Sequence, residues 1–172
     1  MEKGCIQFYT GDGKGKTTAA LGLALRAAGR NLNVFIGQFA KGMAYGEHKA
    51  LARFSDHIRI RQFGRRCFIH GKPEEEDIRI AREGWEEAKQ AVAGGEYDVV
   101  ILDEAGIAMY YNLVTEEEFA GLLDMKPEGV ELILTGRKIP ESLFEKADLV
   151  TEMREVKHYY TKGIEARVGI EY

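Results

Sequence analysis

A glycine-rich segment near the start of the chain, residues 8–18 (FYTGDGKGKTT), constrains the fold more than any other stretch. It lies between a short apolar run at residues 5–9 and an alanine- and leucine-rich run at residues 18–28. This order predicts a strand, a glycine loop and a helix, which is the context in which a glycine and lysine pattern binds phosphate. Glycines let successive backbone N–H groups point into one concavity, and the helix behind adds the positive end of its dipole.

The loop supplies most of the candidate binding residues. Lys16 is expected to reach the β- and γ-phosphates of a nucleotide, and the Thr17 hydroxyl to hold Mg²⁺. The usual G-x-x-x-x-G-K-[ST] pattern has a glycine where this chain has Thr10. The alternative, a glycine-rich turn with incidental lysines, is disfavoured because residues 15–18 open a helix directly after a strand. The predicted phosphate-binding residues are Thr10, Gly11, Asp12, Gly13, Lys14, Gly15, Lys16, Thr17 and Thr18.

Length, charge and hydropathy limit the class of protein. A chain of 172 residues that is 45% hydrophobic can bury a substantial core, so we expect one domain over residues 1–172. The net charge of −4 argues against nucleic acid as the main partner. The first strand begins without a preceding signal peptide, and no apolar run approaches the roughly 20 residues of a membrane helix. We therefore predict a cytoplasmic protein with no membrane partner.

Strand-like and helical runs alternate along the remaining chain, which predicts an α/β fold. Further strands are expected at residues 34–39, 58–63, 97–104, 130–134 and 149–153, with helices between them. Such alternation specifies a mostly parallel central sheet of about six strands, with helices on both faces. The tail, residues 155–172, is polar and aromatic, and its pattern predicts no element.

One predicted helix carries a regular apolar face. Its apolar residues recur at spacings of three and four, which is typical of a helix packed against a sheet. These residues are Ile78, Ala81, Trp85, Ala88 and Val92. We interpret Trp85 as a core residue and not as part of a ligand site, because it lies on this face.

Two polar residues follow the predicted strand Val34–Phe39. Gln38 and Lys41 lie at its carboxyl end, and in open α/β sheets ligands bind outside the carboxyl ends of strands. Both are therefore predicted near the same edge of the sheet as the glycine loop. The alternative, an ordinary polar loop after a strand, remains open for each.

Two acids close a later β-branched run. Asp103 and Glu104 end residues 97–104, and an acid at the end of a buried strand in a phosphate-loop fold orients Mg²⁺ opposite the loop threonine. We predict a metal site formed by Thr17, Asp103 and Glu104. The alternative is an aspartate that caps the following short helix.

Several motifs occur together and in a fixed order: TGDGKGKTTAA at 10–20, QFAKG at 38–42, LDE at 102–104 and LTGR at 134–137. Residues 147–158 (ADLVTEMREVKH) and the closing segment 169–172 (GIEY) extend the pattern. In this combination the chain resembles the ATP:corrinoid adenosyltransferase family over nearly its full length. The family's loop has the same short form, which accounts for Thr10.

The resemblance implies transfer of the 5′-deoxyadenosyl group of ATP to the cobalt(I) of a reduced corrinoid, with release of triphosphate. It implies a RecA-like fold, Mg²⁺ or Mn²⁺ as the metal, a homodimer, and a flavoprotein as the reductant. Cobalt(I) is already a strong nucleophile, so the reaction needs charge stabilisation and alignment instead of a general base. Lys16 and Glu104 are the predicted catalytic residues.

The resemblance also assigns binding residues outside the loop. Arg26 is implied as a further phosphate contact, and Arg137 as part of the nucleotide site. Relatives tend to carry aromatic residues, including a tryptophan, in the loop before the third helix, where they crowd the lower face of the corrinoid. Here that loop offers Phe68, Ile69 and His70 and no tryptophan. We expect Phe68, or His70 in its place, to contact the corrinoid.

Two other functions are consistent with these residues. A RecA-type NTPase or small-molecule kinase would cleave at the γ-phosphate, with Glu104 or Arg137 in a water-positioning or arginine-finger role. A nucleotide-dependent binding module would use the loop only to gate a partner surface. The products distinguish the three functions: triphosphate with corrinoid, ADP without it, or neither.

Overall fold

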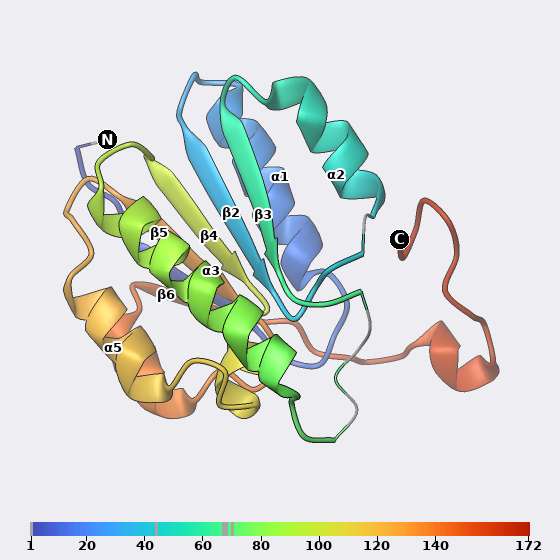
Figure 1. The fold of residues 1–172 in the computed structure, drawn as a ribbon. Helices are drawn as coiled ribbons and strands as arrows, with labels where there is room; N and C mark the ends of the chain where they lie inside the picture. The colour runs from blue at the N-terminus through green and yellow to red at the C-terminus, as the bar shows by residue number, and fades with distance from the viewer. Residues whose placement is uncertain (1, 44, 67–68, 70) are drawn as a thin grey trace.

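A computed structural model describes residues 2–43, 45–66, 69 and 71–172. Within them, six strands form one sheet in the order β3-β2-β4-β5-β1-β6 (Figure 1). All five neighbouring pairs are parallel, which confirms the predicted α/β fold. The strands are β1 (Ile6–Thr10), β2 (Val34–Phe39), β3 (Ile58–Phe63), β4 (Val99–Asp103), β5 (Glu131–Thr135) and β6 (Leu149–Glu152).

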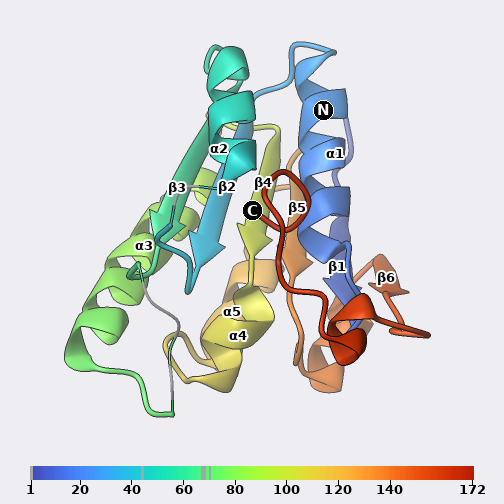
Figure 2. The same ribbon diagram turned by 90° about the vertical axis from the view of Figure 1, so that its right-hand side faces the viewer.

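Helices cover both faces of the sheet (Figures 1 and 2). One face carries α1 (Lys16–Ala28) and α2 (Gly46–Leu51). The other face carries α3 (Glu75–Ala93), α4 (Ala105–Tyr110) and α5 (Glu116–Asp124). Short 3-10 helices occur at η1 (Ala52–Phe54), η2 (Glu141–Lys146) and η3 (Tyr159–Lys162). Among the helices of the described ranges, none is long and apolar enough to cross a membrane.

Each face of the sheet has its own hydrophobic core. On the α1 side, small residues such as Ala20 and Ala24 pack against the strands, so the helix approaches the sheet closely. On the α3 side the core is aromatic. The Trp85 side chain is 1% exposed, and its ring centroid lies 4.7 Å from that of Phe119. The interpretation of Trp85 as a core residue is confirmed.

The apolar face of α3 differs from the prediction at one position. Ile78 is 44% exposed, whereas its neighbour Asp77 is 4% exposed. The Asp77 carboxylate accepts hydrogen bonds from the Arg65 guanidinium at 2.7 and 2.9 Å and from the Glu74 N–H at 2.9 Å. The hydrogen-bonded Asp77 carboxylate therefore occupies the buried position at the start of α3. The buried face of the helix begins at Asp77, one residue earlier than the apolar pattern suggests.

The sheet brings distant segments to one edge. Because all strands run the same way, the loops after β1, β2, β4 and β5 leave from the same side of the molecule. Gln38 of β2 and Asp103 of β4 are register partners. The glycine loop, the residues after β2 and the acids after β4 therefore lie at the edge where ligands bind in such folds.

Candidate active site

The glycine loop follows β1 and leads directly into α1. Gly15 has φ +122°, a conformation that side-chain-bearing residues rarely adopt. A Cβ built on Gly13 would lie 2.6 Å from the Met153 carbonyl oxygen, so only glycine is accommodated there. The Gly13 N–H donates to that same oxygen at 2.6 Å. This amide therefore anchors the loop to the segment after β6 instead of facing the pocket.

Lys16 lies at the start of α1 and is 8% exposed. Its ammonium donates hydrogen bonds to the carbonyl oxygens of Gly11 at 2.6 Å and Gly13 at 2.8 Å. Burial, followed by the nearby positive charge of Arg137, lowers the pKa of Lys16. A buried cation whose partners among the described residues are carbonyl oxygens is well suited to attract an anion such as a phosphate.

Asp103 is the hub of the site, with 1% of its surface exposed. Its Oδ1 accepts hydrogen bonds from the hydroxyls of Thr17 at 2.8 Å and Thr135 at 2.6 Å. Its Oδ2 accepts from the Lys41 ammonium at 2.7 Å and the Gln38 amide at 3.1 Å. One carboxylate thus joins β2, β4, β5 and α1, and all four of its protein partners donate to it.

These partners keep the buried pair charged. Burial alone raises the pKa of Asp103, but the Lys41 charge and the donated hydrogen bonds hold it below its usual value. Burial lowers the pKa of Lys41, and the Asp103 carboxylate more than offsets this, so the net pKa is raised. The pair is therefore an ion pair at neutral pH.

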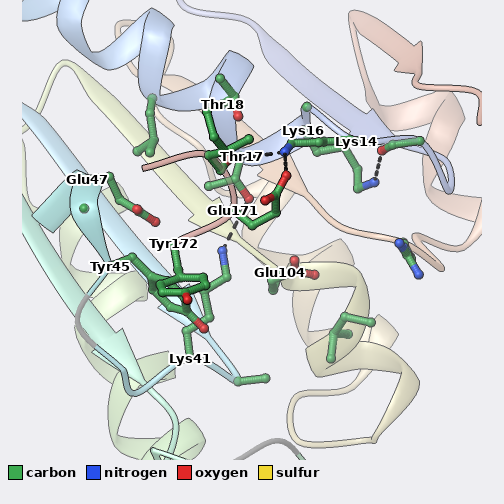
Figure 3. A pocket seen from close by; sticks show the side chains of 18 of the residues that line it. Lys14, Lys16, Thr17, Thr18, Lys41, Tyr45, Glu47, Glu104, Glu171 and Tyr172 are labelled. Atoms are coloured by element: carbon green, nitrogen blue, oxygen red, sulfur yellow. Dashed lines mark hydrogen bonds and ion pairs between the residues drawn. The ribbon is translucent and has the colours of Figure 1, made fainter. Parts of the chain in front are cut away.

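Glu104 immediately follows this hub and lines the pocket (Figure 3). Burial, and then the negative charge of Asp103, raises its pKa. Its backbone has φ +58°, in the left-handed region, which costs a non-glycine residue roughly 1–2 kcal/mol. Its N–H donates to the Thr135 hydroxyl at 3.1 Å, which helps to hold this conformation. It precedes α4 but its side chain makes no capping hydrogen bond there.

The predicted metal residues have suitable chemistry. Thr17, Asp103 and Glu104 offer hydroxyl and carboxylate oxygens, which are the donors that Mg²⁺ prefers. The Thr17 hydroxyl and the Asp103 carboxylate are already within 2.8 Å of each other. These residues therefore fit a magnesium ion. The Asp103 carboxylate that would face the ion also accepts a hydrogen bond from the Lys41 ammonium.

A pocket of about 950 Å³ opens beside this cluster (Figure 3). One end is polar, with Lys16 and Thr17 of the loop. Apolar and aromatic side chains extend from there along the wall. They are Leu21, Leu25, Tyr45, Ile69, Ile107 and Tyr111.

The C-terminal segment forms part of the pocket wall, which the sequence did not predict. Residues 169–172 line the pocket, and Figure 2 shows the chain end between α1 and α2. The Lys14 ammonium donates to the Glu171 carboxylate at 2.6 Å and to the Tyr159 hydroxyl at 2.8 Å. The hydrogen bond from Lys14, followed by those from Tyr159 and Arg167, holds the pKa of Glu171 well below its usual value. The GIEY motif was the available signal, but it carries no periodicity.

The structure brings most of the predicted site residues together, with some exceptions. Residues 13–18, Lys41, Glu104 and Arg137 line the pocket. Gln38 is fully buried behind it. Arg26 is exposed in the last turn of α1 and does not line the pocket, although its neighbour Leu25 does.

The remaining predicted residues lie beside the pocket or outside the described chain. Thr10 ends β1, Gly11 and Asp12 belong to the loop, and none of the three lines the pocket. The Thr10 carbonyl oxygen accepts from the Met153 N–H at 2.8 Å, so this part of the loop is tied to the segment after β6. Phe68 and His70 lie outside the described residues.

The fold resembles that of a solved structure with little sequence in common. The flagellar accessory protein FlaH from Methanocaldococcus jannaschii superposes with a TM-score of 0.61 at 12% identity, over 88% of this chain and 72% of that one. At this identity the likeness concerns the fold alone, and it agrees with a RecA-like phosphate-loop architecture.

Sequence comparison is more specific. The family model described as ATP:corrinoid adenosyltransferase BtuR/CobO/CobP matches residues 2–172. A corrinoid adenosyltransferase of Escherichia coli K12 is 37% identical over 99% of this chain and 87% of its own length. Corrinoid adenosyltransferase CobA of Salmonella typhimurium is 35% identical over 99% of this chain and 87% of its own length. A corrinoid adenosyltransferase of Sinorhizobium sp. is 36% identical over 99% of this chain and 81% of its own length. The chain therefore belongs to the ATP:corrinoid adenosyltransferase family.

Proposed function

We propose that this protein transfers the 5′-deoxyadenosyl group of ATP to the cobalt(I) of a reduced corrinoid and releases triphosphate. The observation that carries the proposal is the pocket of about 950 Å³ with cationic Lys16 at one end and apolar walls beyond it. Small-molecule sites usually measure about 300–1,000 Å³. This pocket therefore has room for a nucleotide and for the reacting edge of a second substrate. Family membership supports the same reaction.

The triphosphate would bind at the polar end of the pocket. Lys16 would exchange its carbonyl partners for phosphate oxygens, and the first N–H groups of α1 would add donors and the positive end of the helix dipole. Arg137 contributes a further positive charge on the same side. Charge of this kind stabilises a leaving triphosphate more than it stabilises bound ATP, and so it accelerates the step.

The site also has residues for a magnesium ion. Thr17, Asp103 and Glu104 would hold it. When bound, the ion would neutralise charge on the triphosphate. Burial, and then the negative charge of Asp103, raises the pKa of Glu104, and a bound cation would stabilise its ionised form.

The chemical step needs alignment and no proton transfer. Cobalt(I) attacks the 5′-carbon with its own electron pair, the cobalt–carbon bond forms, and the bond from C5′ to the phosphate oxygen breaks. The electron pair of the broken bond leaves on the triphosphate. Residues of the apolar wall, such as Tyr45 and Ile107, would fix the nucleoside and exclude water, so that the 5′-carbon is presented to cobalt.

Further features of the proposal rest on the family. They are a homodimeric assembly, a flavoprotein that delivers the electron to cobalt, and Phe68 or His70 against the lower face of the corrinoid. Arg26 would contact phosphate only if the nucleotide, or one bound by a second copy of the chain, lies against the exposed side of the last turn of α1.

A product assay tests the reaction. Purified protein is incubated with ATP, Mg²⁺ and chemically reduced cobalamin or cobinamide, and the phosphorus products and the corrinoid spectrum are followed together. Triphosphate and adenosylated corrinoid should form in equal amounts and only when both substrates are present. ADP released without corrinoid would instead identify a RecA-type NTPase or kinase, and the proposed function would be wrong. Neither product, with ATP still bound, would indicate a binding module.

A further inference from the structure

A chain of hydrogen bonds runs behind the pocket from α2 to Asp103. Gln38 is fully buried, and its amide N–H donates to Asp103 Oδ2 at 3.1 Å. Its carbonyl oxygen, Oε1, lies 2.9 Å from Nε2 of His48 in α2. Gln38 therefore links the carboxylate hub of the site to an imidazole that the proposed reaction does not use.

The hydrogen bond at the other ring nitrogen of His48 shows which atom donates at each step from His48 to Asp103. Its Nδ1 accepts a hydrogen bond from the backbone N–H of Tyr45 at 3.0 Å. An acceptor nitrogen carries no proton, so the proton of the neutral ring is on Nε2. His48 thus donates to the Gln38 carbonyl, and Gln38 in turn donates to Asp103.

The hydrogen bond donated by His48 fixes the orientation of the Gln38 amide. A buried carbonyl oxygen without a donor is unfavourable, and turning the amide over would set that oxygen against the Asp103 carboxylate. With the His48 donor present, only one amide orientation satisfies both ends. The Asp103 carboxylate then faces Thr17 and Lys41 with the geometry observed.

We propose that His48 is a positioning residue, which acts through Gln38 to hold the Asp103 carboxylate for magnesium-bound ATP. The inference rests on the proposed function, because it assumes that Thr17 and Asp103 serve a metal–nucleotide site. Partners one step removed from a metal site typically change its affinity 10- to 100-fold when lost. His48 also stacks near Tyr45, a residue of the pocket wall, with ring centroids 6.1 Å apart.

Two variants of nearly equal size isolate the donor. His48→Gln and His48→Met both lose the ring nitrogen that accepts from the Tyr45 N–H, but only glutamine keeps an N–H at the end of the side chain. ATP binding is measured by calorimetry with Mg²⁺ and with a chelator instead. His48→Met should weaken magnesium-dependent ATP binding about tenfold, while His48→Gln stays within about twofold of wild type. Binding of metal-free ATP should be the same in all three proteins.

A double-mutant cycle tests the route through Gln38. In a Gln38→Met background the His48→Met change should have no further effect, because the link is already broken. Equal affinities of the two His48 variants for ATP with Mg²⁺ would overturn the inference. So would a His48→Met change that weakens this binding as much in the Gln38→Met background as it does in wild type. A wild-type protein without magnesium-dependent ATP binding would overturn the proposed function and this inference with it, before any variant is examined.

One measurement needs no variant, and it decides the matter if the His48 substitutions fail to fold. Nitrogen-15 NMR of wild-type protein at about pH 8, above the usual titration range of imidazole, reports which ring nitrogen carries the proton. The Nε2–H form, hydrogen-bonded to Gln38, is expected. A proton on Nδ1 would overturn the inference, because His48 could then not donate to Gln38.

Discussion

The Thr17 hydroxyl donates to Oδ1 of Asp103 across 2.8 Å, although the two residues are 86 positions apart in the chain. This bond joins the first turn of α1 to the carboxyl end of β4. The same carboxylate pairs with Lys41 at 2.7 Å. Asp103 is therefore part of the fold as well as part of the site, and its substitution should affect both.

Asp103→Asn should destabilise the protein by about 3 kcal/mol, because it leaves the mostly buried Lys41 ammonium without its counter-ion. Chemical denaturation at pH 7 measures this loss. A Lys41→Met change added to Asp103→Asn should restore part of the stability, since no unpaired charge then remains. If the double variant loses as much unfolding free energy as the two single variants together, the ion pair does not couple these residues.

The pH dependence of Asp103→Asn has a definite sign. The folded-state pKa of Asp103 is lowered, so its stabilisation is present above the unfolded pKa of about 3.9 and is lost as the pH falls through the lower folded value. Wild type and variant should therefore converge in stability once the pH falls below the lowered folded-state pKa of Asp103. A gap that stays constant down to acid pH would mean that ionised Asp103 is not the source of the difference.

Glu104→Gln should separate stability from activity. The pKa of Glu104 is raised by burial and by Asp103, so the protonated form is favoured in the folded state and stability is lost as the pH rises through that pKa. The neutral amide avoids this cost, and the variant should melt at a higher temperature than wild type at pH 7. This advantage should vanish near pH 4.

The same variant should transfer the adenosyl group about 10- to 100-fold more slowly, because one oxygen donor of the metal site loses its charge. Glu145→Gln, an exposed change in η2, is the matched control and should alter neither the melting temperature nor the rate. A Glu104→Gln protein with full activity would remove Glu104 from the mechanism.

The sheet and the loop could be predicted because local patterns determine them. The β-branched run that became β4 and the glycine loop before α1 each signal one element, and parallel connections leave few alternatives for their order. Ile78 was assigned wrongly because a three-and-four spacing cannot show that Arg65 would satisfy Asp77 in the buried position. Periodicity reports apolarity, whereas burial also depends on partners from other elements.

The site was predictable in part for a similar reason. Asp103 and Thr17 belong to motifs whose chemistry is readable from the chain, so their meeting was expected. Nothing local indicates that Thr135 would donate to the same oxygen, or that residues 169–172 would reach the pocket. Such contacts depend on how three or more segments pack together, and no single stretch of sequence contains that information.

Lys16→Met should abolish the reaction and leave the fold intact. Methionine keeps the length and packing of the buried side chain but removes the charge, and loss of one such group costs about 100- to 1,000-fold in rate. Burial lowers the pKa of Lys16, so its charge does not stabilise the folded state. Circular dichroism should match wild type and the melting temperature should not fall, while triphosphate release does fall. Wild-type activity in this variant would exclude the loop lysine from the mechanism.

The C-terminal wall of the pocket should contribute to ATP affinity. Glu171 accepts from Lys14 and from the Arg167 N–H at 2.8 Å, so it fastens the tail to the glycine loop. Glu171→Gln removes the charge that binds Lys14, and ATP binding should weaken severalfold as the wall loosens; Glu165→Gln, an exposed change in the same tail, is the control. The competing explanation is that Lys14 binds phosphate and Glu171 only competes for it, in which case Glu171→Gln would tighten ATP binding. Calorimetry distinguishes the two by the direction of the change.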